Sequence, residues 1–421
     1  MSGLVIGAVA DDFTGATDLA GMFARAGMRT AQAIGTGGLE AIDTTALDAV
    51  VVALKTRSID PADAVRQSVA AAEALRRLGT RQLYFKYCST FDSTPEGNIG
   101  PVADALADLV GAEAVPFCPA FPENGRSVHR GYLFVGDVLL NESGMEHHPL
   151  TPMTDANLVR WLRQQTAAPV GLLRADVLRQ GVDAARQAVA GSEARYLVTD
   201  AVTYDDVVVT AEVFREAPLV TGGSALGLAL GQLWQRGRPL ADATRLEPKP
   251  GRKAILAGSC STRTLAQIEA FTGPRFHLEA AAAVEDAAGA VAAALAWCDR
   301  QGDGPLLVHA SASPEAVKTA QARFGVERTG AAVEAAMAAL GQALVKRGVS
   351  RLIVAGGETS GAVTQALAVP ALRIGAEIAP GVPWTQVLGG PADGLCLALK
   401  SGNFGGVDMF DTAWNLLETT P

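Results

Sequence analysis

Short apolar runs alternate along this chain with segments whose apolar residues recur at a helical spacing. The runs 4–9 and 48–54 are typical of buried parallel strands. Residues 61–78 follow the helical period instead, beginning at a proline and carrying apolar side chains at positions 65, 69, 72, 75 and 78. Further strands are expected at 82–85, 196–199, 254–257 and 352–355. The alternation predicts an α/β protein in which helices cover both faces of parallel sheets.

A stretch rich in proline, glycine and charge interrupts this alternation at residues 236–251. It contains three prolines and two glycines, and a new strand begins at Lys253. The 421 residues also exceed what one ordinary core accommodates. We therefore expect two domains, residues 1–244 and 245–421. Each is expected to be a mainly parallel sheet flanked by helices, with a ligand cleft between the two.

Composition removes several classes of protein. Hydrophobic residues make up 49% of the chain, which supports a large core and argues against disorder. The net charge of −9, without any block rich in lysine and arginine, argues against a nucleic-acid partner. The alanine-rich segment 280–297 is interrupted by Glu285 and Asp286, so it does not predict a membrane span.

The five cysteines and the paired histidines indicate neither a disulfide framework nor a metal site. The cysteines are scattered, and no two of them have the CxxC spacing of a zinc knuckle. This pattern favours a reducing compartment. His147 and His148 are adjacent, so on an extended chain they point to opposite faces. Asp11 and Asp12 end the first apolar run early, which argues against a signal peptide. We expect a cytoplasmic protein, of a size at which homodimers are common.

Two carboxylates, Asp11 and Asp12, stand where the first strand ends and the next helix begins. Ligands of open parallel sheets bind at the carboxyl ends of the strands. Asp12 there could accept a proton from a substrate hydroxyl. An aspartate at this position is also a normal helix N-cap, which stabilises a helix by about 1 kcal/mol, and the spacing alone leaves both interpretations open.

A second polar group follows the strand at 82–85. Residues 86–98 combine a cation with hydroxyls, an amide and acids, as expected for binding a sugar that bears a carboxylate. Lys86 would meet the charge, and Ser93 and Asn98 the hydroxyls, although turn formation explains part of this composition. Arg57, after the strand at 48–54, would add a bidentate carboxylate contact, or it forms an ordinary ion pair.

Glycine and hydroxyl residues follow three strands of the C-terminal half, at 258–261, 356–361 and 400–406. Together such loops would surround a nucleotide with backbone N–H groups, although loops of α/β proteins are often rich in glycine. The segment 221–227 has the glycine spacing of a phosphate-binding P-loop but is followed by Leu228 and Ala229 instead of lysine and serine or threonine. No dinucleotide-binding fingerprint follows a strand elsewhere.

With these motifs the chain resembles the four-carbon acid sugar kinase family over nearly its full length. The matching segments are 10–16, Lys86 with 92–94, 356–361 and 400–405. The resemblance implies an acid-sugar-binding N-terminal domain and an ATP-binding C-terminal domain. Segments 84–98 and 140–154 resemble the branch of the family that phosphorylates the C4 hydroxyl of 3-oxotetronate.

The resemblance also implies a role for each motif residue. Asp12 would accept the proton of the C4 hydroxyl, and Mg²⁺ would bridge the ATP phosphates without a dedicated protein site. The residues expected to bind the acid sugar are Asp11, Arg57, Lys86, Ser93, Asn98, Asn124 and Arg126. Those expected to bind ATP are Ser259, Gly356, Gly357, Glu358, Thr359 and Gly402.

Other functions remain compatible with these motifs. A D-threonate or D-erythronate kinase of the same family would share them. A sensor that binds an acid sugar or a nucleotide without turnover would need only one of the two sets of loops. A nicotinamide-dependent dehydrogenase is disfavoured by the missing dinucleotide fingerprint.

Overall fold

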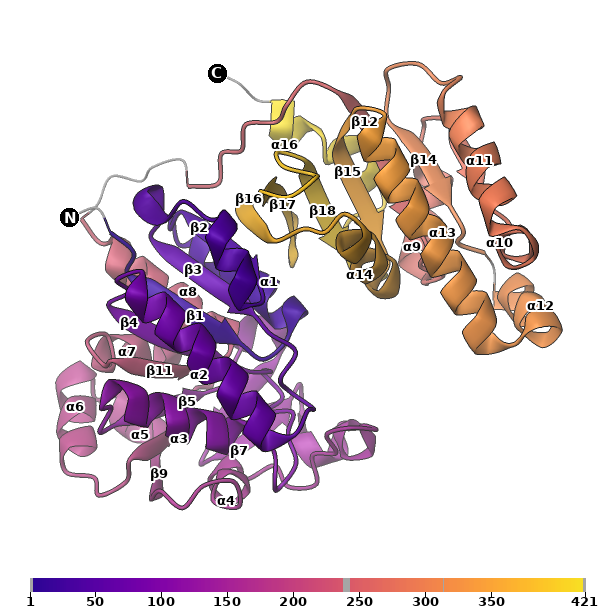
Figure 1. Cartoon of the computed structure of the whole chain (residues 1–421). Coiled ribbons are helices and arrows are strands. Elements are labelled where there is room, and N and C mark those ends of the chain that lie inside the picture. Colours follow the sequence, from indigo (N-terminus) through magenta and orange to yellow (C-terminus); the bar gives the residue numbers. More distant parts are fainter. Residues whose placement is uncertain (1–2, 238–242, 313, 419–421) are drawn as a thin grey trace. The chain divides into compact units, whose positions relative to one another are not determined.

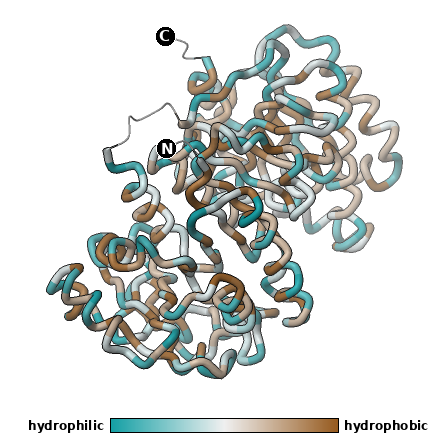
Figure 2. The backbone as a smooth tube through the Cα atoms, turned by 60° about the vertical axis from the view of Figure 1, so that its left-hand side comes forward, coloured by the Kyte–Doolittle hydropathy of each residue, from teal (hydrophilic) through white to brown (hydrophobic). Residues whose placement is uncertain are grey.

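The computed structural model describes residues 3–237, 243–312 and 314–418. The chain divides into two compact units, Met1–Ala243 and Thr244–Pro421 (Figure 1). Part of the predicted linker, residues 238–242, lies outside the described residues. Both units are built from a sheet flanked by helices, so the predicted α/β class is confirmed. Figure 2 shows hydrophobic residues along the interior segments of each unit and hydrophilic residues on many outer turns.

The sheet of the N-terminal unit runs in the order β2-β3-β1-β4-β11-β5-β10-β9, and its strand pairs are parallel. The strands are β1 (Ile6–Ala10), β2 (Thr30–Ile34), β3 (Ala49–Ala53), β4 (Gln82–Lys86), β5 (Val115–Cys118), β9 (Val170–Leu173), β10 (Tyr196–Thr199) and β11 (Leu219–Gly222). The helices are α1 (Phe13–Arg25), α2 (Pro61–Arg77), α3 (Ile99–Val110), α4 (Leu158–Leu162), α5 (Ala175–Leu178), α6 (Val182–Ala190), α7 (Tyr204–Val213) and α8 (Ser224–Gln235). A small antiparallel sheet, β6 (Arg126–His129), β7 (Tyr132–Val135) and β8 (Val138–Leu139), follows β5.

The sheet of the C-terminal unit runs in the order β13-β14-β12-β15-β18-β17-β16. Its strands are β12 (Arg252–Ala257), β13 (Arg275–His277), β14 (Leu306–His309), β15 (Val349–Ala355), β16 (Ala371–Ala379), β17 (Val382–Leu388) and β18 (Cys396–Lys400). Its helices are α9 (Thr262–Ala270), α10 (Ala280–Glu285), α11 (Ala287–Cys298), α12 (Pro314–Phe324), α13 (Val326–Lys346), α14 (Gly357–Ala366), α15 (Met409–Thr412) and α16 (Asn415–Glu418). Strands β13, β14, β12, β15 and β18, which are neighbours in this order, are parallel. Strand β17 is antiparallel to β18 and to β16.

Strand register fixes where the loops of each unit begin. In the N-terminal unit Ala10 is level with both Ala53 and Lys86, so β1, β3 and β4 end together. In the C-terminal unit Ala355 is level with both Ala257 and Lys400. Each unit therefore presents three neighbouring loops at one carboxyl edge, where ligands of parallel sheets bind.

The glycines of segment 221–227 serve packing. A Cβ on Gly222 would overlap the carbonyl oxygen of Cys118, and one on Gly227 would overlap Leu19 of α1. These glycines let β11 and α8 approach their neighbours closely, which explains a P-loop spacing without the P-loop lysine. No helix among the described residues has the length and apolar character needed to cross a membrane.

The close packing of α8 on α1 yields a stability prediction. Gly231→Ala would place a Cβ 2.7 Å from Cβ of Ala26 and 3.2 Å from Sδ of Met28. We expect the free energy of unfolding to fall by about 1–3 kcal/mol, measured by urea denaturation. The control is Gly21→Ala in α1, where no atom lies within 4 Å of the new Cβ, and it should leave stability unchanged or slightly higher. Equal effects of both substitutions would contradict the packing argument.

Candidate functional site

In the acidic turn after β1, one oxygen of Asp12 caps a helix and the other has no partner among the described residues. Asp12 is the N-cap of α1, and its Oδ1 accepts a hydrogen bond from the backbone N–H of Gly15 at 3.0 Å. The other oxygen, Oδ2, has no hydrogen-bond partner among the residues that the structure describes, and 28% of the side chain is exposed. The capping interpretation is therefore correct for Oδ1, and Oδ2 stays available to a ligand.

Arg57, in the loop after β3, binds both aspartates. Its Nε and Nη2 contact Oδ2 and Oδ1 of Asp11 at 3.0 and 2.8 Å, and Nη2 also contacts Oδ1 of Asp12 at 2.7 Å. Asp11 is only 4% exposed and has both oxygens engaged. Burial alone would lower the pKa of Arg57, but Asp11 and Asp12 outweigh it and raise this pKa above its usual range. Of the two aspartates, Asp12 is the one with a free oxygen.

Asn98 holds the Arg57 loop in place. Its Nδ2 donates to the backbone carbonyls of Thr56 and Ile59 at 2.6 and 2.9 Å. The backbone N–H of Thr56 in turn donates to the carbonyl of Asp11 at 2.9 Å. The Oδ1 of Asn98 is buried without a partner among the described residues. The amide nitrogen therefore positions Arg57, and only the amide oxygen remains for a substrate.

Lys86 adds a buried cation beside the two aspartates. It is 3% exposed, ends β4, and donates from Nζ to the carbonyl of Tyr87 at 2.7 Å. A Cβ built on Gly15 would lie 3.2 Å from this Nζ, so the ammonium sits at the first turn of α1. An ammonium has three N–H donors, and one is engaged in the described contacts. The other two can receive an anionic group.

Three other predicted sugar-binding residues lie in different surroundings. Ser93 is fully buried, donates to the carbonyl of Phe91 and accepts hydrogen bonds from Trp161 and Gln165. Asn124 ends a short 3-10 turn (Pro122–Asn124), and its carbonyl accepts a hydrogen bond from Arg126 of β6. The adjacent Glu123 pairs with Arg25 in the last turn of α1, whereas Asp12 caps the first turn. None of these three residues has a described contact with the Arg57 cluster, which consists of Arg57, Asp11, Asp12, Asn98 and Lys86. Asp92, which precedes Ser93, lies 3.9 Å from Nη1 of Arg57.

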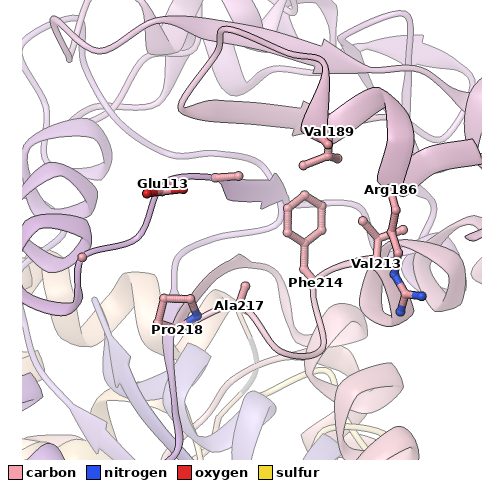
Figure 3. Close-up of a pocket in the computed structure, with 10 residues that line it drawn as sticks. Glu113, Arg186, Val189, Val213, Phe214, Ala217 and Pro218 are labelled. Atoms are coloured by element: carbon pink, nitrogen blue, oxygen red, sulfur yellow. The ribbon is translucent and has the colours of Figure 1, made fainter. Parts of the chain in front are cut away.

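Two cavities lie in the N-terminal unit. One of about 130 Å³ is lined by Arg57, Asn98 and Thr151 among others. A larger one of about 380 Å³ lies among the loops before β5 and β11, with Phe214 in its wall and Glu113 and Arg186 on different sides (Figure 3). The larger cavity contains none of the predicted site residues. The smaller cavity is the better candidate because it touches the Arg57 cluster.

The three glycine loops of the C-terminal unit lie against one another. A Cβ on Gly258 would overlap Oγ1 of Thr359, and one on Gly402 would overlap Oγ of Ser259. A Cβ on Gly356 would lie 3.1 Å from the backbone nitrogen of Ser259. The structure thus brings together Ser259, Gly356, Thr359 and Gly402, which the sequence analysis had placed on three separate loops.

The first turn of α14 is open to an anion. Its N-cap is Gly356, which has a φ of 131° and no side chain to accept the N–H groups of the turn. Gly357, Glu358 and Thr359 form that turn, and among the described contacts their N–H groups have no capping partner. Unpaired N–H groups and the helix dipole both favour a phosphate at this position.

Helix α9 anchors the loop that carries Gly402, in part through Thr264 and Gln267, to which the sequence analysis gave no role. The carbonyl of Gly402 accepts hydrogen bonds from Ser261, Thr264 and Lys400 at 2.6, 2.8 and 3.0 Å. Gln267 donates to the carbonyls of Phe404 and Gly406. The sequence signal for this anchor is the spacing of three between Ser261, Thr264 and Gln267, which places these polar side chains on one face of the helix.

Comparisons with known proteins agree with the division into two units. A family model described as a sugar-binding N-terminal domain matches residues 6–230. A second model, described as a nucleotide-binding C-terminal domain, matches residues 254–410.

Named relatives and a solved structure span nearly the whole chain. A 3-oxo-tetronate kinase of Burkholderia multivorans is 51% identical, over 98% of this chain and 97% of that protein. A 3-oxo-tetronate kinase of Cupriavidus necator is 50% identical, over 97% and 96%. A crystal structure of a Haemophilus influenzae protein superposes with a TM-score of 0.91 at 39% identity, covering 98% of this chain and all of that one.

The Arg57 cluster predicts a stability loss that depends on pH. Arg57→Met leaves the buried Asp11 without its cation, and we expect a loss of about 3 kcal/mol in the free energy of unfolding at pH 8. Burial raises the pKa of the Asp11 carboxyl and Arg57 opposes this rise, so removing Arg57 lets folded Asp11 hold a proton that the unfolded chain releases. Stability of the variant therefore falls as pH increases, and the loss should be smaller at pH 5.

Denaturation of Arg57→Met at pH 5 and pH 8 measures this difference. The matched control is Arg66→Met, which breaks the exposed pair between Arg66 and Asp63 and should cost less than about 1 kcal/mol at either pH. A loss for Arg57→Met that equals the control, or that does not change with pH, would contradict the prediction.

Proposed function

This chain belongs to the four-carbon acid sugar kinase family, and we propose that it transfers the γ-phosphoryl group of ATP to the C4 hydroxyl of 3-oxotetronate, giving the 4-phosphate. The observation that carries the proposal is the 51% identity to a 3-oxo-tetronate kinase over 98% of the chain. The free oxygen of Asp12 and the converging glycine loops supply the chemistry that such a transfer needs.

Asp12 accepts the proton of the attacking hydroxyl in this proposal. Gly15 and Arg57 hold its Oδ1, so the carboxylate is fixed in orientation while Oδ2 faces the substrate. Phosphoryl transfer depends on alignment and charge stabilisation more than on covalent catalysis. A fixed carboxylate contributes the alignment, and it takes up the proton as the O–P bond forms.

Positive charge on the substrate side comes from Lys86. Two of its N–H donors are free to bind the sugar acid carboxylate, whereas the Arg57 fork is shared between Asp11 and Asp12. We assign Lys86 as the main carboxylate-binding residue. Arg57 then acts mainly by orienting Asp12, and Asn98 holds the Arg57 loop.

The C-terminal loops hold ATP in this proposal, with its phosphates at the first turn of α14. Mg²⁺ commonly keeps several waters and binds through substrate phosphates plus one or two carboxylates. The C-terminal loops offer one such carboxylate, because Glu358 is exposed in the first turn of α14. When bound, the ion neutralises the phosphates.

An ADP-release assay with Mg·ATP tests the substrate. We expect turnover with 3-oxotetronate and at least 100-fold lower kcat/KM with D-threonate, L-threonate and D-erythronate, because a site built for one set of hydrogen bonds rejects analogues by about this factor or more. Turnover with only a threonate or the erythronate would support the proposed kinase activity but contradict 3-oxotetronate as its substrate. No turnover with any of the four compounds would contradict the proposed substrate. It would favour either another acid sugar as substrate or a protein that binds its ligand without catalysis.

Asp12→Asn tests the proton acceptor. The amide oxygen can still cap α1, so the fold is kept, but the amide cannot take a proton. We expect kcat to fall about 100- to 10,000-fold while KM for ATP changes little. The control is Asp43→Asn, which alters an exposed carboxylate that caps another short turn, and it should keep wild-type kinetics. Wild-type kcat in Asp12→Asn would remove Asp12 from the mechanism.

A further inference from the structure

Lys400 is a buried cation at the base of the glycine loops. It is 1% exposed and is the last residue of β18, level with Ala355 and one residue before Ser401. Its Nζ donates to Oγ1 of Thr264 and to the carbonyl of Gly402, both at 3.0 Å. The third N–H of the ammonium has no partner within the described part of the chain. Thr264 of α9 and the carbonyl of Gly402 thus fix the ammonium of Lys400, and one of its N–H donors remains without a partner among the described residues.

The surroundings of Lys400 contain no compensating acid. Its Nζ makes no ion pair with the carboxylates of the described residues. Burial lowers the pKa of Lys400 to about 8, and the positive charge of Arg263 on α9 adds to this effect. Other titratable side chains on this edge include Glu358 of α14 and Cys260 of the loop after β12, which are both exposed. His277 and His309 end β13 and β14 and stack on each other. Buried lysines are normally paired, so an unpaired one indicates an anion that arrives from outside.

We propose that Nζ of Lys400 binds a phosphate group of the nucleotide. This inference rests on the proposed kinase function and adds a residue to its ATP site. Gly402 and Gly356, which flank Lys400 in space, both contact Ser259, and the backbone N–H of Gly356 donates to the carbonyl of Lys400 at 2.9 Å. A phosphate at the uncapped turn of α14 would therefore lie next to the strand end that carries this lysine.

The N-terminal unit offers the same arrangement on the substrate side. Lys86 is the last residue of β4 and is level with Ala10, which precedes the turn into α1. Lys400 is the last residue of β18 and is level with Ala355, which precedes the turn into α14. In both units a buried lysine thus stands beside a strand that leads into a helix N-terminus, which Asp12 caps in α1 and no side chain caps in α14. The repetition favours anion binding over a purely structural role for Lys400.

Phosphate binding by Lys400 has a consequence for protons. With a pKa of about 8 the free ammonium is about half protonated at pH 8, and an adjacent phosphate favours the charged form. Binding of ADP at pH 8 should therefore take up about half a proton per site, and close to none at pH 6.5, where Lys400 is already charged. A lysine that only anchors the Gly402 loop would produce no such uptake.

Isothermal titration of the full chain with Mg·ADP measures this uptake, using two buffers of different ionisation enthalpy at pH 8 and at pH 6.5. In the wild type we expect uptake at pH 8. Lys400→Met should abolish it and weaken ADP binding about 10- to 100-fold. Lys400→Arg keeps a charge that does not titrate in this range, so ADP binding should persist without proton uptake. The matched control is Lys346→Met, on the exposed last turn of α13, which should behave as the wild type.

The outcomes separate this inference from the function on which it rests. If Lys400→Met binds ADP as tightly as Lys346→Met, Lys400 is not a phosphate ligand and the kinase proposal is untouched. ADP binding retained by Lys400→Arg separates loss of the charge from misfolding of the Met variant. If the wild type fails to bind ADP at all, the nucleotide site itself is wrong, and Lys400 loses its role with it.

Discussion

The contact of one guanidinium with two carboxylates determines the geometry of the N-terminal site. Arg57 joins the loop after β3 to the turn after β1, and Asn98 supports it from the loop after β4. Charge-assisted hydrogen bonds therefore join the loops after β1 and β3, and neutral hydrogen bonds from Asn98 join the loop after β4 to the loop after β3. Because Arg57 and Gly15 share one oxygen of Asp12, the second oxygen is left unpaired at a defined position. Asp11 has no such oxygen, and its part is to hold Arg57.

Strand register decides which loops lie next to one another in each unit. Parallel strands that end together place their following loops side by side, so a short turn and a lysine from the next strand meet without any long connection. In the C-terminal unit this constraint combines with glycine, because a Cβ at Gly258 or Gly402 would overlap its neighbours on the adjoining loops. Close backbone approach is what allows three loops to surround one ligand.

Sequence reasoning predicted the α/β class, most strand positions and the residues of the glycine loops, because these depend on local pattern. It could not separate Asp11 from Asp12, since that difference comes from Arg57, more than forty residues away. Ser93 had the right chemistry for a sugar ligand, but Trp161 and Gln165 satisfy its hydroxyl from distant segments. Lys400 was visible in its motif, and only burial without a nearby acid distinguishes it from an exposed lysine. Homodimer formation and cytoplasmic location stay predictions.

The anchoring of the Gly402 loop by α9 has an evolutionary consequence. Gln267 and Thr264 hold this loop through its backbone carbonyls, and every amino acid supplies a carbonyl. The anchor on α9 therefore does not depend on which side chain stands at the anchored loop positions. We expect relatives to keep the two polar residues of α9. Selection on this part of the site then acts on a helix that, in these contacts, touches the loop and not the ligand.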